Sequence, residues 1–401
     1  MRTTWNFYSA GQLVFGNHAI DQLGSLIARR HGARALIVTD PILERAGIVA
    51  ATLKPLERAG IAAEVFSGGE PEPSIAAALN AVAHARRFRP DVLIGLGGGS
   101  NMDLAKIAAI LYAHGGEPQQ YFGFDNVPGP VTPLVCVPTT AGTGSEVSHA
   151  AVVTDTAQHI KVSTLSNYLR PAVAVVDPLL TYSCPAKVTA ESGIDALTHA
   201  IEALTATDFA ALAVPPDEGT PYDGRHPLGD CLAEKAIALV GEHLATAVRE
   251  PSNAAAREGM ALAATLAGLA FSNCGVALVH ALEYPIGGVV HCSHGQGNGL
   301  LLPYVMRYNL PARREAFAQI ARLLGVNTAG LSVDQAAEAA IVAVEELHRE
   351  IDIPHRLREI GVTAEQLPDF AAKAFAIKRL MLTNPRLPTE AELLALLQAA
   401  L

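Results

Sequence analysis

Four side chains of the kinds that bind divalent metals stand out in the second half of the chain. Asp195 and His199 are spaced i and i+4, so on a helix both leave the same face. His280 and His294 follow in two further apolar stretches. A single buried histidine is more often a hydrogen-bonded core residue than a ligand, because a buried polar group must be paired. Three histidines and one aspartate together make a metal site as well supported as separate core residues, and such a mixed set suits Fe(II), Zn(II) or Mn(II) without a choice among them.

A glycine loop in the first half is suited to bind phosphate. Gly97, Gly98 and Gly99 follow a buried β-branched run and precede a helix expected to start at Ser100. Glycines let a phosphate approach the backbone, and the N–H groups at a helix start attract its charge. The alternative is an ordinary tight turn, followed by a capping box between Ser100 and Asp103. The spacing is not G-x-G-x-x-G, because Ser100 stands where the last glycine would fall.

A second polar loop follows the next buried run, and it contains Thr139, Thr140 and Thr143. Loops at the carboxyl ends of parallel strands face the same crevice, where open α/β sheets bind ligands. The two loops together favour a dinucleotide. Asp40 directly follows the run 35–39. Its carboxylate could accept hydrogen bonds from an adenosine ribose, and its charge would repel the 2′-phosphate of NADP. Equally, Asp40 and Pro41 could start a turn and cap the following helix.

The elements that must position these residues divide the chain in two. Short β-branched runs alternate with Ala-rich helical patterns up to about residue 185, which predicts a parallel sheet with crossover helices. The strand runs then vanish and amphipathic stretches follow one another. We therefore expect an α/β dinucleotide-binding domain over 1–185 and an all-helical metal-binding domain over 186–401. Proline and glycine interrupt the helical pattern over 207–230, which predicts a long exposed loop.

Composition excludes several classes of protein. The 401 residues are half hydrophobic and 17% charged, unlike a disordered chain, and the net charge of −10 comes without a basic run that could follow nucleic acid. Five widely spaced cysteines without a C-x-x-C pair suggest reduced core thiols, and the N-terminus does not resemble a signal peptide. The apolar stretch 260–290 is interrupted by polar residues, so it predicts a buried helix pair rather than a membrane span. These features predict a cytoplasmic protein.

At this point the motifs resemble those of the iron-containing, group III alcohol dehydrogenases. Residues 97–106 resemble that family's GGGSxxDxAK loop, and residues 138–146 its PTTxGTGSE loop. Residues 177–181 resemble DPxLT, residues 193–202 resemble GxDAxxHxxE, and the segments around His280 and His294 match the two remaining ligand motifs. The similarity extends from about residue 14 to residue 386, and such a set of motifs in order is very improbable by chance.

The resemblance implies a ligand set, a cofactor and site residues. The implied metal ligands are Asp195, His199, His280 and His294, with Fe(II) as the common metal and Zn(II) in some members. An acid at Asp40 favours NAD over NADP. The residues expected to bind the cofactor are Asp40, Gly97, Gly98, Gly99, Ser100, Asp103, Thr139, Thr140, Thr143, Lys161 and Leu180. Members are often dimers or larger, so we expect a homo-oligomer.

Three departures from the family pattern bear on function. Many members carry a second active-site histidine four residues after the third ligand, where this chain has Tyr284. We name Tyr284 and His280 as the candidate catalytic residues, since a phenol can donate a hydrogen bond to a substrate oxygen. Pro71-Glu72-Pro73 stands where many members have Pro-Asn-Pro. The insertion near 207–230 and the Tyr-Pro at 284–285 most resemble the hydroxyacid-oxoacid transhydrogenase branch.

The expected function is metal-dependent hydride transfer between a small primary alcohol, or its aldehyde, and NAD. One alternative is a hydroxyacid-oxoacid transhydrogenase that acts on substrates similar to 4-hydroxybutyrate. An alternative from another class is a carbon–oxygen lyase of the dehydroquinate synthase type. That reaction would need several lysines and arginines around the cleft, and the second half is poor in lysine.

Overall fold

The computed structural model describes residues 2–156, 160–214 and 219–401. The chain forms two compact units. Residues 8–184 form an α/β unit, and residues 185–401 together with residues 1–7 form a helical unit. Residues 2–7 therefore belong to the helical unit.

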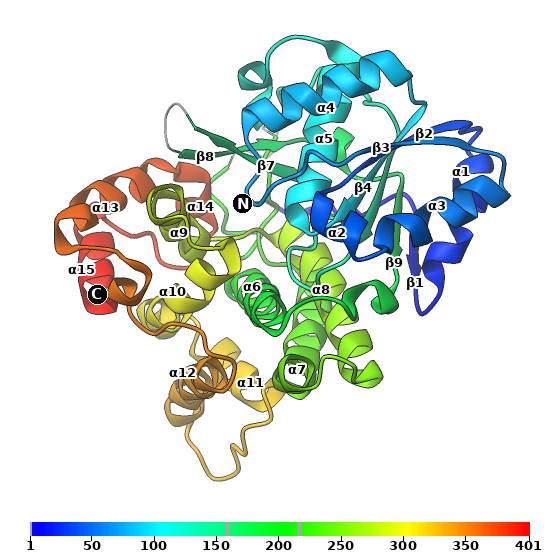
Figure 1. Ribbon diagram of the computed structural model, residues 1–401. Helices are drawn as coiled ribbons and strands as arrows, with labels where there is room; N and C mark the ends of the chain where they lie inside the picture. Colours follow the sequence, from blue (N-terminus) through cyan, green and yellow to red (C-terminus); the bar gives the residue numbers. More distant parts are fainter. Residues whose placement is uncertain (1, 157–159, 215–218) are drawn as a thin grey trace. The chain divides into compact units, whose positions relative to one another are not determined.

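Six parallel strands form the main sheet of the α/β unit, in the order β1-β9-β6-β4-β2-β3 (Figure 1). The strands are β1 (Leu13–Phe15), β2 (Arg34–Val38), β3 (Ala62–Phe66), β4 (Val92–Gly97), β6 (Leu134–Pro138) and β9 (Val173–Val176). The helices are α1 (Leu23–Ala28), α2 (Pro41–Arg45), α3 (Ile48–Arg58), α4 (Ile75–Phe88) and α5 (Gly99–His114). This arrangement confirms the predicted parallel sheet with crossover helices.

Both faces of the sheet are buried, which explains why its strands are almost continuously apolar. Side chains alternate between the faces along a strand. In β2, Leu36 and Val38 pack into a core with α4 and α5, whereas Ala35 and Ile37 pack into a core with α1 and α3. This double coverage holds the strand ends in place, and with them the loops that follow β4 and β6.

A second, smaller sheet was not predicted. It consists of β5 (Gly123–Phe124), β8 (Ile160–Leu165) and β7 (Ala150–Asp155), in that order. Strands β7 and β8 are antiparallel, and β7 alternates between half-buried and buried residues. A short stretch of alternating residues directly after a polar loop can be a strand or a continuation of the loop. The sequence pattern alone does not distinguish these two possibilities.

The helical unit confirms the predicted all-helical second half. Its helices are α6 (Ala186–Thr205), α7 (Pro227–Arg249), α8 (Ala254–Cys274), α9 (Leu278–Val290), α10 (His294–Asn309), α11 (Arg314–Leu323), α12 (Val333–Glu350), α13 (Leu367–Ala376), α14 (Lys378–Thr383) and α15 (Glu390–Ala400). Polar side chains start several of them: Asn253 caps α8, Ser293 caps α10, and Ser332 forms a capping box at α12. Helix α7 packs against both α6 and α8.

Within the described ranges, no single helix is both long and apolar enough to cross a membrane. Helices α8 and α9 pass that test only as a pair, and the chain bends by 103° between them. Most residues of both helices are buried inside the unit. They form the buried helix pair that the interrupted apolar stretch predicts.

The segment 207–230 is only partly the exposed loop that its prolines predict. Helix α7 already begins at Pro227, and Tyr222 and Asp223 are buried. Arg313 donates to Oδ2 of Asp208 at 3.0 Å and holds the start of the segment. The segment is less exposed than predicted because its polar groups have partners outside the segment. Pro215 and Pro216 lie outside the described residues.

The first residues of the chain form an arm on the helical unit. The Arg2 guanidinium pairs with the Asp223 carboxylate at 2.6 Å, and both side chains are nearly buried. The backbone N–H of Asn6 donates to the same carboxylate at 3.1 Å. Trp5 stacks on the imidazole of His226, with ring centroids 4.2 Å apart and planes 2° from parallel. These contacts explain why the arm belongs to the helical unit.

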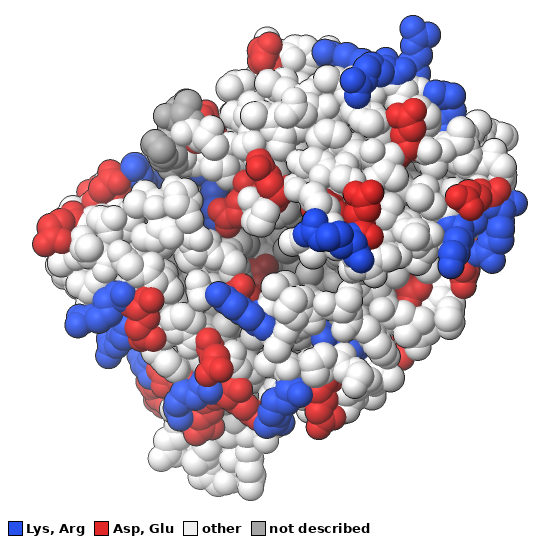
Figure 2. Space-filling view, in the orientation of Figure 1, with Lys and Arg blue, Asp and Glu red and all other residues white. Residues whose placement is uncertain are grey.

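On the face shown in Figure 2, basic and acidic side chains are interspersed rather than gathered by sign. Several charges of the helical unit form exposed pairs, such as Arg249 with Glu350 at 2.6 Å. Exposed pairs of this kind contribute about 0–1 kcal/mol each. The five cysteines form no disulfide. Cys231 is exposed and Cys184 is half-buried, whereas the sequence predicted core positions for all five.

Candidate functional site

The four predicted ligand residues come together in the helical unit. Asp195 and His199 lie one turn apart on α6, His280 lies near the start of α9, and His294 is the first residue of α10. One potential ligand atom from each lies within 4.8 Å of all the others. Three of the four are buried and His294 is partly exposed. The helical spacing therefore places all four side chains around one point.

Two buried carboxylates orient two of these histidines. Glu202 on α6 accepts a hydrogen bond from Nδ1 of His280 at 2.6 Å, and Glu283 on α9 accepts one from Nδ1 of His294 at 2.6 Å. A proton on Nδ1 leaves Nε2 with a lone pair. Both Nε2 atoms then face the cluster as ligand atoms. Metal-binding histidines usually have such a carboxylate partner on the other ring nitrogen.

The lone pairs of the cluster converge on the side-chain amide of Asn298. Its Nδ2 lies 2.8 Å from Oδ1 of Asp195, 3.2 Å from Nε2 of His280 and 3.0 Å from Nε2 of His294. An amide nitrogen carries two hydrogens, so it cannot satisfy three acceptors. Buried acceptors of mixed nitrogen and oxygen type that converge in this way fit a divalent cation such as Fe(II) or Zn(II).

Electrostatics keep Asp195 ready to act as a ligand. Burial raises the pKa of this carboxyl, but His199, His294 and His280 and the hydrogen bond from Asn298 lower it, so that the net pKa lies below the ordinary value. The group is therefore a carboxylate at neutral pH. An ionised carboxylate is the form that binds a metal.

Tyr284 lies beside this cluster. It is half-buried on α9, one turn after His280, and its ring centroid lies 6.1 Å from that of His294. The structure therefore brings both candidate catalytic residues to the same place. A phenol there has the chemistry to donate a hydrogen bond to an oxygen.

In the α/β unit, the two predicted phosphate-binding loops lie against each other. They follow the adjacent parallel strands β4 and β6, where Gly97 is paired with Pro138. Gly97 has φ of +144°, a conformation that favours glycine. A Cβ on Gly99 would lie 2.7 Å from Cγ2 of Thr143, and one on Gly98 would lie 3.3 Å from Oγ1 of Thr140. Only glycines leave this cradle open.

The start of α5 lies in the cradle and is not capped by a side chain. Its N-cap is Gly98, and the helix begins at Gly99, one residue before the predicted start. The capping box between Ser100 and Asp103 is therefore wrong. Asp103 instead accepts hydrogen bonds from Oγ of Ser145 at 2.6 Å and from the backbone N–H of Val152. The N–H groups at this helix start remain suited to bind a phosphate.

A buried lysine holds the second loop in shape. Lys106 is fully buried on α5, and its Nζ donates to the backbone oxygens of Ser145 and Ala150 at 2.8 and 2.7 Å. It also lies 3.2 Å from the backbone oxygen of Ser148. Burial lowers the pKa of Lys106, and the nearby Asp103 opposes that shift. Lys106 thus fastens the residues that follow Thr143 to the same helix that starts at the glycines.

Asp40 is engaged in structural contacts. Its Oδ1 accepts from the backbone N–H of Ile42 at 2.7 Å and caps α2, as the alternative interpretation predicts. Its Oδ2 accepts from Nδ2 of Asn101 at 2.7 Å. Asn101 lies at the start of α5, so Asp40 is held beside the cradle. Oδ1 also accepts from the backbone N–H of Leu43 at 3.1 Å, whereas Oδ2 keeps a second lone pair, so capping does not exclude a ribose.

The remaining cofactor candidates differ in their surroundings. Thr139 is buried and donates through its backbone N–H to the oxygen of Gly97 at 3.0 Å, so it belongs to the cradle. Lys161 is buried on β8 and pairs with Glu72 at 2.7 Å. Leu180 packs into the core on the α1 and α3 face of the sheet.

Comparisons with known proteins agree with this geometry. A model of iron-containing alcohol dehydrogenases matches residues 10–178, and one of the C-terminal part of the Fe-containing alcohol dehydrogenase family matches residues 221–401. The chain belongs to the iron-containing alcohol dehydrogenase family. An NAD-dependent methanol dehydrogenase of Bacillus methanolicus is 37% identical over 99% of this chain and 100% of its own length. A 1,3-propanediol dehydrogenase of Klebsiella pneumoniae is 39% identical over 96% of both chains.

A solved structure supports the same assignment. A 1,3-propanediol oxidoreductase superposes with a TM-score of 0.92 at 38% identity, covering 99% of this chain and 100% of the other. The predicted metal-dependent alcohol oxidoreductase is therefore confirmed at the level of the iron-containing alcohol dehydrogenase family. The comparisons do not favour the transhydrogenase or the lyase.

In this iron-containing alcohol dehydrogenase, the sequence assigned no role to the three side chains that form hydrogen bonds with the candidate ligands. Glu202, Glu283 and Asn298 are all buried. A signal existed for Glu202, because it follows Asp195 at i+7 and His199 at i+3 and therefore lies on the same face of α6. Glu283 and Asn298 gave no comparable signal, because their partners lie on other helices.

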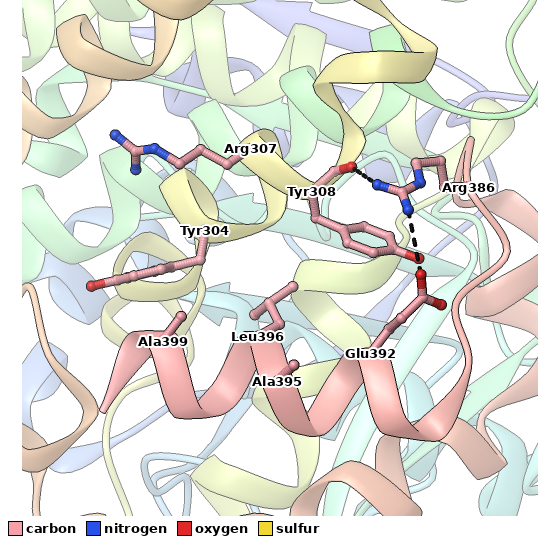
Figure 3. Close-up of a pocket in the computed structure, with 8 residues that line it drawn as sticks. All are labelled: Tyr304, Arg307, Tyr308, Arg386, Glu392, Ala395, Leu396 and Ala399. Atoms are coloured by element: carbon pink, nitrogen blue, oxygen red, sulfur yellow. Dashed lines mark hydrogen bonds and ion pairs between the residues drawn. The ribbon is translucent and has the colours of Figure 1, made fainter.

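A cavity of about 370 Å³ lies elsewhere on the helical unit (Figure 3). None of the predicted site residues lines it. On α10 its first lining residue, Tyr304, is ten residues after His294, about 15 Å along the helix. Two arginines lie at its rim, and both are engaged: Arg307 pairs with Glu345, and Arg386 with Glu392. The lining residues are Tyr304, Arg307, Tyr308, Arg386, Glu392, Ala395, Leu396 and Ala399.

Proposed function

We propose that this chain oxidises a small primary alcohol or diol with NAD as hydride acceptor, or reduces the matching aldehyde with NADH. The observation that carries the proposal is the buried cluster of Asp195, His199, His280 and His294, whose ligand atoms lie within 4.8 Å of one another. The relatives named for methanol and 1,3-propanediol support a small alcohol as substrate.

We assign the metal to the helical domain over 186–401, and the dinucleotide to the α/β domain over 1–185. The four clustered residues would hold Fe(II), with Zn(II) as the second choice. When bound, the metal would polarise the alcohol oxygen and NAD would accept the hydride. The residues proposed for the cofactor are Asp40, Gly97, Gly98, Gly99, Ser100, Asp103, Thr139, Thr140, Thr143, Lys161 and Leu180.

The chain's own side chains would bind and orient the reactants. His280 presents Nε2 to the cluster because Glu202 accepts the hydrogen on its Nδ1. Tyr284 would hold the substrate oxygen through a hydrogen bond and carry a proton, in the place where many members have a histidine. Asp40 lies beside the cradle and would repel the 2′-phosphate of NADP, which favours NAD.

We further propose that the enzyme is a cytoplasmic homo-oligomer, a dimer or larger. Strand β1 lies at one edge of the main sheet, and an edge strand offers unpaired backbone groups to a second copy. Light scattering of the purified chain measures the oligomeric state directly, and a monomeric mass at working concentration would contradict this part of the proposal.

The first experiment measures NADH formation by metal-stripped protein after Fe(II) is added anaerobically, or Zn(II) in air. The panel contains short alcohols, diols and hydroxy acids. We expect metal-dependent turnover of short alcohols that is abolished by Asp195→Ala. A matched control is Asp334→Ala, an exposed aspartate of α12 in the same unit, which should keep wild-type turnover.

Two results would contradict the proposal. Turnover that does not depend on added metal would remove the role of the cluster. A hydroxy acid that reduces an added oxo acid without release of NADH would replace the dehydrogenase by the transhydrogenase.

A further inference from the structure

Each helix that carries a candidate ligand also carries a buried group that holds a ligand of a different helix. These groups are Glu202 on α6, Glu283 on α9 and Asn298 on α10. We call them the support groups. None of them is in the proposed ligand set, and each lies within one turn of a ligand on its own helix.

The first support group holds the helix as well as the imidazole. Glu202 accepts from Nδ1 of His280 at 2.6 Å and from the backbone N–H groups of Ala277 and Val279 at 2.9 and 2.7 Å. No cap side chain of α9 itself satisfies these N–H groups, because the N-cap is Ala277. Glu202 therefore fixes the start of α9 relative to α6, and with it the backbone from which His280 projects.

The other two contacts complete a circuit. Glu283, three residues after His280 on α9, accepts from Nδ1 of His294 on α10 at 2.6 Å. Asn298, four residues after His294 on α10, donates to Oδ1 of Asp195 on α6 at 2.8 Å. Helix α6 thus holds a ligand on α9, α9 holds one on α10, and α10 holds one on α6. Each helix therefore holds a ligand of another helix and has one of its own ligands held in turn, and Nδ2 of Asn298 also lies 3.2 Å from Nε2 of His280.

We propose that Glu202, Glu283 and Asn298 act as one closed ring of positioning residues that sets the spacing of the ligand atoms. This inference rests on the proposed metal function of the cluster. A helix moves as a rigid body, so a broken contact at α9 displaces His280 and also the carboxylate that orients His294. Loss of one support group therefore weakens the constraint from the next. The three contributions to metal affinity are coupled rather than independent.

The test is a double-mutant cycle on metal affinity. The dissociation constant for Zn²⁺ is measured by competition with a chromophoric chelator, for the full chain and for Glu202→Gln, Glu283→Gln and the double variant. Glutamine keeps one acceptor oxygen, but it loses the negative charge that strengthens the hydrogen bond from Nδ1, and its other polar atom becomes a donor. We expect each single change to weaken Zn²⁺ binding about 10- to 100-fold. The double variant should lose clearly less than the product of the two single losses.

A matched control separates positioning from general stability. Asp223→Asn removes the charge of another buried carboxylate of the same unit, which holds the N-terminal arm instead of a ligand. It should lower the melting temperature and leave Zn²⁺ affinity unchanged. If Glu202→Gln does not fold, Glu283→Gln combined with Asn298→Leu tests the same ring through its other two members.

The outcomes are distinguishable. Losses that multiply in the double variant, or single variants with wild-type affinity, would overturn the ring while leaving the metal site intact. A wild-type chain that takes up neither Zn²⁺ nor Fe(II), or that keeps its metal affinity in Asp195→Ala, would overturn the proposed function together with the ring. Sub-multiplicative losses with an unaffected Asp223→Asn would support both.

Discussion

Histidines in this protein are buried in two different ways. Two of the three in the candidate metal cluster, His280 and His294, have carboxylate partners on Nδ1. His348 on α12 is equally buried, yet its Nε2 has no hydrogen-bond partner within the described part of the chain. Burial, and next the nearby His355, lowers the pKa of His348 to about 3 from its ordinary 6.5. The folded protein therefore keeps this imidazole neutral.

The neutral His348 makes stability depend on pH. Between about pH 3 and pH 6.5 the unfolded chain binds a proton at this position that the folded chain does not. Stability from this group is therefore complete above pH 6.5 and falls as the pH is lowered, by about 1.4 kcal/mol per pH unit in that window. In His348→Leu, the slope of the unfolding free energy against pH should decrease by about one proton, as measured by urea unfolding at several pH values.

Ile341→Val on the same helix is the control for the His348 prediction. It removes a methylene from a fully buried side chain without removing a titratable group. It should lower stability by about 0.5–1.5 kcal/mol at every pH and leave the slope unchanged. A wild-type slope in His348→Leu would contradict the assignment of the buried neutral imidazole.

At this scale the sequence predicts ligands better than it predicts their supports. Asp195 and His199 could be paired because helical spacing is a local property, and burial of polar residues in apolar stretches singled out His280 and His294. The structure brings all four together. Glu283 and Asn298 could not be predicted in the same way, because their contacts depend on how three helices pack. Asp40 satisfies the capping interpretation, which a local Asp-Pro pattern already indicates.

At the scale of elements, the close packing at the start of α5 allows a specific prediction about cofactor binding. A methyl group on Gly99 would lie 2.7 Å from the side chain of Thr143, so Gly99→Ala should push the second loop away from the helix start. Overpacking of this kind costs about 1–3 kcal/mol. If this free-energy cost falls on cofactor binding, the dissociation constant of NADH should rise roughly tenfold or more. Fluorescence titration measures this change.

Gly129→Ala provides the comparison for that substitution. A Cβ on Gly129 would make only an ordinary contact, 3.8 Å from the ring of His114. This variant should bind NADH as the wild type does. If Gly99→Ala also bound NADH with unchanged affinity, the cradle formed by the two loops would not be the dinucleotide site.

The elements themselves were predictable where the pattern was long or doubly buried. The runs that became β2, β4, β6 and β9 are continuously apolar because helices cover both faces of the sheet. The sheet of β5, β7 and β8 was missed, since its strands are short and partly polar. The segment 207–230 was predicted as exposed because prolines interrupt its helical pattern. Such an interruption does not show whether individual residues are buried, as Tyr222 and Asp223 are.

For the whole molecule, the N-terminal arm joins distant parts of the chain and carries the only tryptophan. Arg2→Ala removes the partner of the nearly buried Asp223 carboxylate, which should lower the stability of the helical unit by about 1–3 kcal/mol. Trp5 should then leave the ring of His226 and become solvated. A red shift of tryptophan emission, together with a lower unfolding midpoint, is the expected result.

The control for the arm is an exposed ion pair of the other unit. Arg58 and Asp21 lie 2.9 Å apart, and both side chains are more than half exposed. Arg58→Ala should change stability by less than about 1 kcal/mol and leave tryptophan emission unchanged. An Arg2→Ala variant with wild-type emission would show that the arm is not held by this pair.

The arm also has a consequence for synthesis of the protein on the ribosome. Arg2 and Asp223 are 221 residues apart. At about 5–20 residues per second, the ribosome needs on the order of 10–40 s to make the intervening chain. The α/β unit, residues 8–184, is complete before Asp223 exists, so it can fold while its own leading residues still have no partner. Residues 2–7 are therefore made long before their partners, and they are among the last to reach their native place.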